Sequence, residues 1–111
     1  MIRVRIDRKR DTKEIIGFRV DGHADYDASG KDIVCAGVSA VTVGIVNAAE
    51  KVIGVILPTD IDDGKLVVIV PSHGSMEQNR SLQLLLESMV VMLQSIEESY
   101  AQYIRLKQND I

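Results

Sequence analysis

The sequence feature that most constrains the fold is an uncharged run of 17 residues, Ile33 to Ala49, bounded by Asp32 and Glu50. No proline or other turn signal interrupts the chain from Ile33 to Ile56, and a segment of that length is too long for one strand. The run therefore predicts a helix from about Ile33 to Ile56, despite a Val and Ile content that favours a strand. A helix that is apolar nearly all round is typical of a buried, central helix.

The same run is at the lower edge of the length that spans a membrane. It contains polar and glycine positions, namely Gly37, Ser39, Thr42, Gly44 and Asn47, which favour a buried helix of a soluble domain.

The N-terminus alternates charged with apolar residues and shows no apolar signal-peptide core. One cysteine, Cys35, cannot form an internal disulfide. We expect a single cytoplasmic domain, residues 1–111, with no membrane partner.

Two short segments before the run have the two-residue period of half-buried strands. Their apolar positions are Ile2, Val4 and Ile6 in the first and Ile16, Phe18 and Val20 in the second. A charged turn, 8–13, separates them. The two segments predict an antiparallel hairpin that ends near His23.

The chain after the first helix predicts two more strands. Pro58 cannot continue the helix, and Asp62-Asp63-Gly64 is a hairpin turn signal. The turn joins a short strand, Thr59–Asp62, to an apolar strand, Leu66–Val70. Because that second strand is continuously apolar, we expect both of its faces to be covered.

The C-terminal third predicts a long helix from about Met76 to Lys107. Its apolar residues recur at three- and four-residue steps: Leu82, Leu85, Leu86, Met89, Leu93, Ile96, Tyr100, Tyr103 and Ile104. The predicted order is therefore ββαββα. This order is typical of an α+β sandwich, a small sheet packed with a buried central helix and a long C-terminal helix.

Cys35 lies in the first turn of the predicted central helix if Asp32 is its N-cap. Free N–H groups and the positive end of a helix dipole stabilise a thiolate, and such positions lower thiol pKa values from about 8.5 to about 3.5–7.5. The same N–H groups are candidates to stabilise an oxyanion on a substrate carbonyl. The position predicts an activated nucleophile.

His23 is the candidate proton carrier for this thiol, because an imidazole titrates near neutral pH. The loop 25–31 between them contains Ser29 and Gly30, a turn signal, and its flexibility lets the two residues meet. We expect this loop to close over a bound peptide. Asp32 and Asp25 are candidates to orient the imidazole.

The residues alone leave other interpretations open. A lone cysteine is often an inert core residue, and a lone histidine is often a turn residue. The Ser39 hydroxyl, one turn after Cys35, bonds either to the helix backbone or to a substrate. A metal site of His23, His73 and Asp25 is a further alternative, although the two histidines lack a ligand-type spacing.

The motifs around these residues resemble those of the ribosomal-processing cysteine proteases called Prp. They are Asp21-Gly22-His23-Ala24, then Gly30, then Asp32-Ile33-Val34-Cys35-Ala36-Gly37-Val38-Ser39-Ala40. Gly44, Val46-Asn47-Ala48, Leu93-Gln94-Ser95-Ile96-Glu97 and Tyr100 also resemble that family. The resemblance covers essentially the whole chain.

The resemblance implies a cytoplasmic cysteine endopeptidase that needs no cofactor and no metal. Its implied substrate is the short N-terminal extension of the twenty-seventh protein of the large ribosomal subunit, cut after an apolar, aromatic-containing segment. Cys35 becomes the nucleophile and His23 the general base, with Asp32 orienting or capping. Ser39, Gly30 and Ala36 are possible substrate-side residues. Members of the family are also known to form homodimers, so the resemblance implies a homodimer.

A non-catalytic, ribosome-associated binding module is the competing hypothesis. It requires a basic RNA-binding face. Up to Val20 the chain has seven basic and three acidic residues, but the whole chain has a net charge of −3. We therefore expect no direct nucleic-acid partner.

Overall fold

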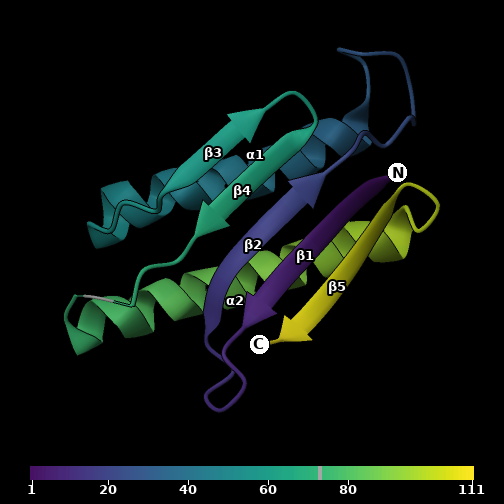
Figure 1. Cartoon of the computed structure of the whole chain (residues 1–111). Coiled ribbons are helices and arrows are strands. Elements are labelled where there is room, and N and C mark those ends of the chain that lie inside the picture. The colour runs from purple at the N-terminus through teal and green to yellow at the C-terminus, as the bar shows by residue number, and fades with distance from the viewer. Residues whose placement is uncertain (73) are drawn as a thin grey trace.

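The structure is a computed structural model that describes residues 1–72 and 74–111. Its elements are β1 (Ile2–Arg8), β2 (Ile15–Asp21), α1 (Ile33–Ala48), the π-helical turn η1 (Ala49–Ile53), β3 (Thr59–Asp62), β4 (Lys65–Ile69), α2 (Met76–Ser99) and β5 (Ile104–Asp110). The five strands form one sheet in the order β3-β4-β2-β1-β5. Both helices lie against the same face of this sheet (Figure 1). The predicted α+β class, a sheet packed with two helices, is confirmed.

The predicted N-terminal hairpin is also confirmed. β1 and β2 pair antiparallel, with Val4 opposite Val20 and Ile6 opposite Phe18. The apolar residues of β1 point toward the helices, and the core forms between the two layers. Its fully buried members include Ile6, Phe18, Leu86, Met89, Leu93 and Ile104.

The C-terminal helix is shorter than predicted, and a fifth strand follows it. α2 ends at Ser99, and Tyr100 has non-helical angles of φ −131° and ψ 45°. β5 then runs parallel to β1, with Leu106 opposite Val4. Ile104 is completely buried there, and the Ile2 N–H donates to the Tyr103 carbonyl over 2.8 Å. The order is thus ββαββαβ, because burial beside β1 outweighs the helical spacing of the last apolar residues.

The central helix differs from the prediction in length and burial. Gly54, which has a left-handed φ of 79°, ends the helical segment, so the chain leaves the helix before Pro58. Only one side of α1 is buried, through Val34, Val38, Thr42 and Ile45. The other side is exposed because the sheet and α2 cover a single face. By length and composition alone, Ile33–Ile53 is also long and apolar enough to cross a membrane.

The strand β4 is not covered on both faces as predicted. Leu66 and Val68 are buried, whereas Ile69 is 59% exposed. The physical reason is that both helices lie on one side, which leaves the other face of the sheet in solvent. β3 is the exposed edge strand beside β4.

Candidate active site

Asp32 connects the loop 25–31 to the start of α1. Its Oδ1 accepts the N–H groups of Val34 and Cys35, both over 3.0 Å, and caps the helix. Its Oδ2 accepts the N–H groups of Tyr26 over 2.9 Å and of Asp27 over 3.4 Å. Burial alone would raise the pKa of Asp32, but these four hydrogen bonds hold the pKa below its usual value. One carboxylate thus fixes the loop against the helix.

The thiol of Cys35 is half-buried in the first turn of α1, as the sequence predicts for this position. The backbone N–H of Ala24 donates a hydrogen bond to its Sγ over 3.3 Å. Because Ala24 directly follows His23, this bond brings the two segments of the site together. The sulfur also lies at the positive end of the helix dipole.

Three backbone N–H groups in the first turn of α1, which the sequence offers as candidates for a substrate oxyanion, already donate hydrogen bonds within the protein. Those of Val34 and Cys35 donate to the Asp32 carboxylate, and that of Ala36 donates to the Asp32 carbonyl over 3.0 Å. The cap and the helix ladder therefore occupy these three candidate donors.

His23 follows β2 through a glycine turn. Gly22 has a left-handed φ of 89°, and a Cβ there would collide with the Met1 carbonyl oxygen. The Gly22 N–H donates to the Gly64 carbonyl over 2.8 Å, which joins the end of β2 to the β3–β4 turn. The imidazole lies against that turn, since a Cβ at Gly64 would be 2.8 Å from the His23 Nε2.

Asp63 is the acidic residue that the structure places beside His23. Its Oδ1 is 3.9 Å from Nε2, and both side chains are largely exposed. The sequence predicted only a turn at this position and proposed Asp32 or Asp25 to orient the imidazole. The Asp32 carboxylate instead accepts four backbone N–H groups. The pairing of Asp21 with Lys65 across β2 and β4 is the long-range relationship that brings Asp63 here.

A cavity of about 540 Å³ collects all the predicted site residues. Its lining includes Cys35, His23, Asp32, Ser39, Gly30 and Ala36, together with Asp25, Asp27, Ser29 and Asp63. Ser39 is exposed on the cavity side, and within the described chain its hydroxyl does not bond back to the helix, whereas that of Thr42 does, over 2.8 Å to the Val38 carbonyl. Four carboxylates make this cavity acidic.

A second, smaller cavity of about 260 Å³ adjoins the first. The two share His23, Cys35, Ser39 and Asp63. The rest of the smaller cavity is mainly apolar, with Val20, Val38, Val43, Ile61 and Leu66 in its lining. The thiol and the imidazole therefore lie between an acidic and an apolar cavity.

Aromatic contacts hold the base of the loop 25–31. The Tyr26 ring packs edge-on against Tyr103, with centroids 5.1 Å apart, and against Tyr100, with centroids 5.8 Å apart. The outer part of the loop forms a turn in which the Lys31 N–H donates to the Ala28 carbonyl over 2.9 Å. The loop thus has an anchored base and an exposed tip at the acidic cavity.

The metal hypothesis finds no support among residues 1–72 and 74–111. Within these ranges no three His, Cys, Asp or Glu residues are grouped so as to hold a metal ion. His73, one of the proposed ligands, lies outside the described residues.

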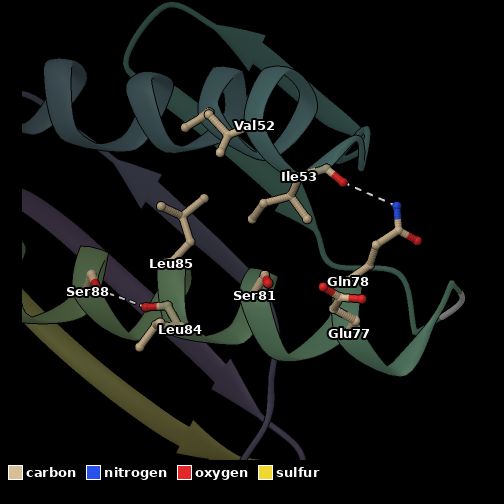
Figure 2. Close-up of a pocket in the computed structure, with 9 residues that line it drawn as sticks. Val52, Ile53, Glu77, Gln78, Ser81, Leu84, Leu85 and Ser88 are labelled. Carbon is tan, nitrogen blue, oxygen red and sulfur yellow. Dashed lines mark hydrogen bonds between the residues drawn. The ribbon is translucent and has the colours of Figure 1, made fainter.

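A third cavity, of about 510 Å³, lies between η1 and α2 (Figure 2). Val52, Ile53, Leu84 and Leu85 line it, and Gln78 closes one end by donating to the Ile53 carbonyl over 3.2 Å. Its lining contains no thiol and no imidazole. It lies toward the C-terminal end of the helical segment, where Val52 is about 25 Å along the axis from Cys35 at a rise of about 1.5 Å per residue.

Comparison with known proteins identifies relatives across the whole chain. A family model described as Cysteine protease Prp matches residues 1–105. The Ribosomal processing cysteine protease Prp of Bacillus subtilis is 39% identical over 113 residues, covering 100% of both chains. That of Staphylococcus aureus (strain NCTC 8325) is 40% identical over 96 residues, covering 86% of this chain and 89% of the relative.

Solved structures agree with these matches. An essential ribosomal processing protease Prp from S. aureus, in complex with a covalently linked product peptide, superposes with a TM-score of 0.82. It is 38% identical and covers 98% of this chain and 100% of its own. The same protease in complex with a substrate peptide gives a TM-score of 0.76 at 38% identity and the same coverage. SMU.848 from Streptococcus mutans gives 0.84 at 26% identity, covering 100% of this chain and 96% of its own.

Proposed function

This chain belongs to the Prp family of cysteine proteases, and we propose that Cys35 and His23 form its catalytic dyad. The proposed substrate is the short N-terminal extension of the twenty-seventh protein of the large ribosomal subunit. The observation that carries the assignment is the Ala24 N–H bond to the Cys35 Sγ. It joins the segment of the imidazole to a thiol at a capped helix start, on the wall of a cavity.

The proposed reaction follows from the chemistry of the pair. His23 accepts the proton of the Cys35 thiol, and the thiolate attacks the scissile carbonyl to form a carbon–sulfur bond. The peptide carbon–nitrogen bond then breaks, and the imidazolium of His23 gives its proton to the leaving amine. Water, deprotonated by His23, hydrolyses the resulting thioester and restores the thiol. No redox step and no metal is needed in this sequence.

We propose a further source of oxyanion stabilisation, since three N–H groups in the first turn of α1 already donate hydrogen bonds within the protein. The Ala24 N–H is directed at the Cys35 sulfur, and Ala24 is only 3% exposed and rigidly held. In the tetrahedral intermediate the sulfur and the oxyanion are bonded to the same carbon, so a donor that reaches the sulfur also lies close to the oxyanion. Ala24 is thus a backbone donor already preorganised beside the reacting atoms.

The linings of the two cavities favour a peptide substrate that has both apolar and basic residues. The smaller cavity is lined by Val, Leu and Ile side chains and suits an apolar or aromatic residue of the extension. The larger one presents Asp25, Asp27, Asp32 and Asp63, which favour a cationic residue near the scissile bond. The S. aureus relative has been crystallised with substrate and product peptides.

We propose that the chain acts as a homodimer in the cytoplasm, outside any membrane. We propose that a second copy of the chain packs against the groove formed by the third cavity, between η1 and α2 (Figure 2), because large apolar side chains line it. Val52 is 81% exposed, Leu84 is 71% exposed and Ile56, nearby in sequence, is 70% exposed. Apolar residues at this density are typical of interfaces between protein copies. A free, unpaired Cys35 is compatible with a reducing compartment.

The proposed substrate is tested by incubating the protein with a synthetic peptide of the extension and identifying the products by mass spectrometry. One cut after the apolar segment, unchanged by a strong chelator, is the expected result. An intact peptide at high enzyme concentration would contradict the substrate. Loss of cleavage on chelation would contradict a metal-free mechanism.

A further inference from the structure

The open face of the sheet, opposite the helices, carries a cluster of cationic side chains. We name it the basic patch and define it as Arg3, Arg5, Arg19, Arg105 and Lys107. We propose that the basic patch binds the phosphate backbone of RNA without regard to base sequence. This binding is separate from the proteolytic function and uses a different face of the molecule.

The strand pairing brings these residues together from distant parts of the chain. Arg3 pairs with Arg105 and Arg5 with Lys107 across the parallel strands β1 and β5. Arg5 also pairs with Arg19 across β1 and β2. Because paired residues point to the same side of a sheet and strands lie about 4.8 Å apart, the five cations form two adjacent rows. Figure 1 shows β1, β2 and β5 side by side with no element in front of them.

The expectation of no direct nucleic-acid partner rests on the net charge of −3, and the predicted C-terminal helix did not place Arg105 and Lys107 on a sheet. β5 replaces that helix end and adds Arg105 and Lys107 beside the N-terminal arginines. The basic patch with the neighbouring Asp7 and Asp21 has a charge of +3, in a chain whose net charge is −3. The charges are therefore segregated by face, which the net charge conceals.

Part of the basic patch has no counter-ion among the residues that the structure describes. Arg5 pairs with Asp7 over 3.2 Å, and Arg19 pairs with Asp21 over 2.8 Å. In residues 1–72 and 74–111, no ion pair involves Arg3, Arg105 or Lys107. Like charges directly opposite each other on neighbouring strands are destabilising. A bound polyanion would relieve this repulsion.

The composition of the basic patch favours RNA phosphates over other anionic partners. Four of its five residues are arginines, whose planar donors match phosphate oxygens bidentately. The exposed apolar residue of the same face, Ile69, lies on β4, on the far side of β2 from β1 and β5, where most of the cations are. The aromatic residues lie elsewhere, with Phe18 in the core and three tyrosines clustered behind the loop. Without a stacking platform, contacts are made to the backbone and not to bases.

The test is fluorescence anisotropy of a labelled 12-nucleotide oligouridine, titrated with the full chain at 50 and 200 mM KCl. Three released counter-ions predict a slope of about −2 in log affinity against log salt, so affinity falls about 20-fold between these conditions. The triple variant Arg3→Gln, Arg105→Gln, Lys107→Gln should lose about tenfold or more of the affinity at 50 mM. An oligoadenosine should bind within about threefold of the oligouridine.

The matched control carries Lys31→Gln, Lys51→Gln and Arg80→Gln, which removes the same charge from exposed positions off the open face. It should bind RNA within about twofold of the unmodified chain. Equal losses in both triple variants would overturn the proposal, as would absence of RNA binding at 50 mM KCl. Tighter binding to a poly-glutamate peptide or to phosphatidylserine vesicles than to RNA would also overturn it. Thermal unfolding should show that both triple variants are folded. The variant in the basic patch removes only charges that repel one another, and the control changes only exposed side chains.

Discussion

The backbone N–H of Ala24 donates a hydrogen bond to the Cys35 Sγ over 3.3 Å. This bond connects the segment after β2, which contains His23, to the first turn of α1. The donor is a backbone group of a buried residue, and the acceptor is the short side chain of a residue in the first turn of a capped helix. The site is therefore largely built from backbone geometry, and the predictions below disturb that geometry at defined places.

Replacing Asp32 by Asn should weaken both the helix cap and the hold on the loop. The pKa of Asp32 lies below its ordinary value in the folded protein, so its ionised form stabilises the fold. That contribution is present above about pH 4, the usual Asp range, and is lost as the pH falls through the lower folded pKa. Urea unfolding at pH 7 and pH 3 should show a larger difference between wild type and Asp32→Asn at pH 7. An equal difference at both pH values would contradict this role.

Replacing Gly64 by Ala should displace His23. A Cβ at Gly64 would be 2.8 Å from the imidazole Nε2, and the residue has a left-handed φ of 67°. Displacement of a catalytic group by about 1 Å can cost about 100-fold in rate, so kcat/KM should fall by tenfold to 100-fold.

Gly44→Ala is the matched control for that substitution. Gly44 lies in α1 with no atom within 4 Å of the added Cβ, so the change should leave kcat/KM unaffected. It should raise the free energy of unfolding by about 0.5–1 kcal/mol. Wild-type activity in Gly64→Ala would show that the β3–β4 turn does not position the imidazole.

Removing the Tyr26 ring should release the base of the loop. Tyr26 packs edge-on against Tyr100 and Tyr103, and each such pair contributes about 0.5–1.5 kcal/mol. Tyr26→Ala should therefore raise KM several-fold with a smaller change in kcat, because the cavity wall becomes less ordered. Tyr26→Phe keeps the ring and should behave as wild type. If the Ala variant retains the wild-type KM in steady-state peptide assays, the loop does not contribute to substrate binding.

A charge in the groove of Figure 2 should dissociate the proposed homodimer. Val52→Glu combined with Leu84→Glu places two carboxylates among exposed apolar side chains. Light scattering after gel filtration should give twice the chain mass for wild type and the single-chain mass for the variant. Ile69→Glu, at an exposed apolar residue on the open face of the sheet, should leave the dimer intact. A monomeric wild type at high concentration would contradict the proposal.

Local features of this fold are predictable from the sequence, and long-range ones are not. The capping of α1 by Asp32 is predictable because the cap and Cys35 are only three residues apart in the sequence. The hairpin of β1 and β2 follows from alternation within a few residues. Asp63 and Gly64 reach His23 only through the pairing of β2 with β4, which no local pattern reveals.

The sequence predicts a helix at residues 104–107, where the structure has β5, for a related reason. Tyr103 and Ile104 continue the helical spacing of α2, but Ile104 and Leu106 also alternate with Arg105 and Lys107. The parallel position beside β1 buries Ile104 completely, and this tertiary burial selects the strand. Arg105 and Lys107 join the basic patch only through this strand pairing, which no local sequence pattern indicates.

The central claim is that Cys35 and His23 together carry the proteolysis. Its most direct test is the rate of cleavage of the extension peptide by Cys35→Ala and by His23→Ala, compared with wild type and with Ser95→Ala, an exposed residue of α2. Both dyad variants should lose at least about 1,000-fold in kcat, with the circular dichroism spectrum unchanged and Ser95→Ala fully active. Cleavage by a folded Cys35→Ala or His23→Ala protein at a rate within tenfold of wild type would contradict the claim.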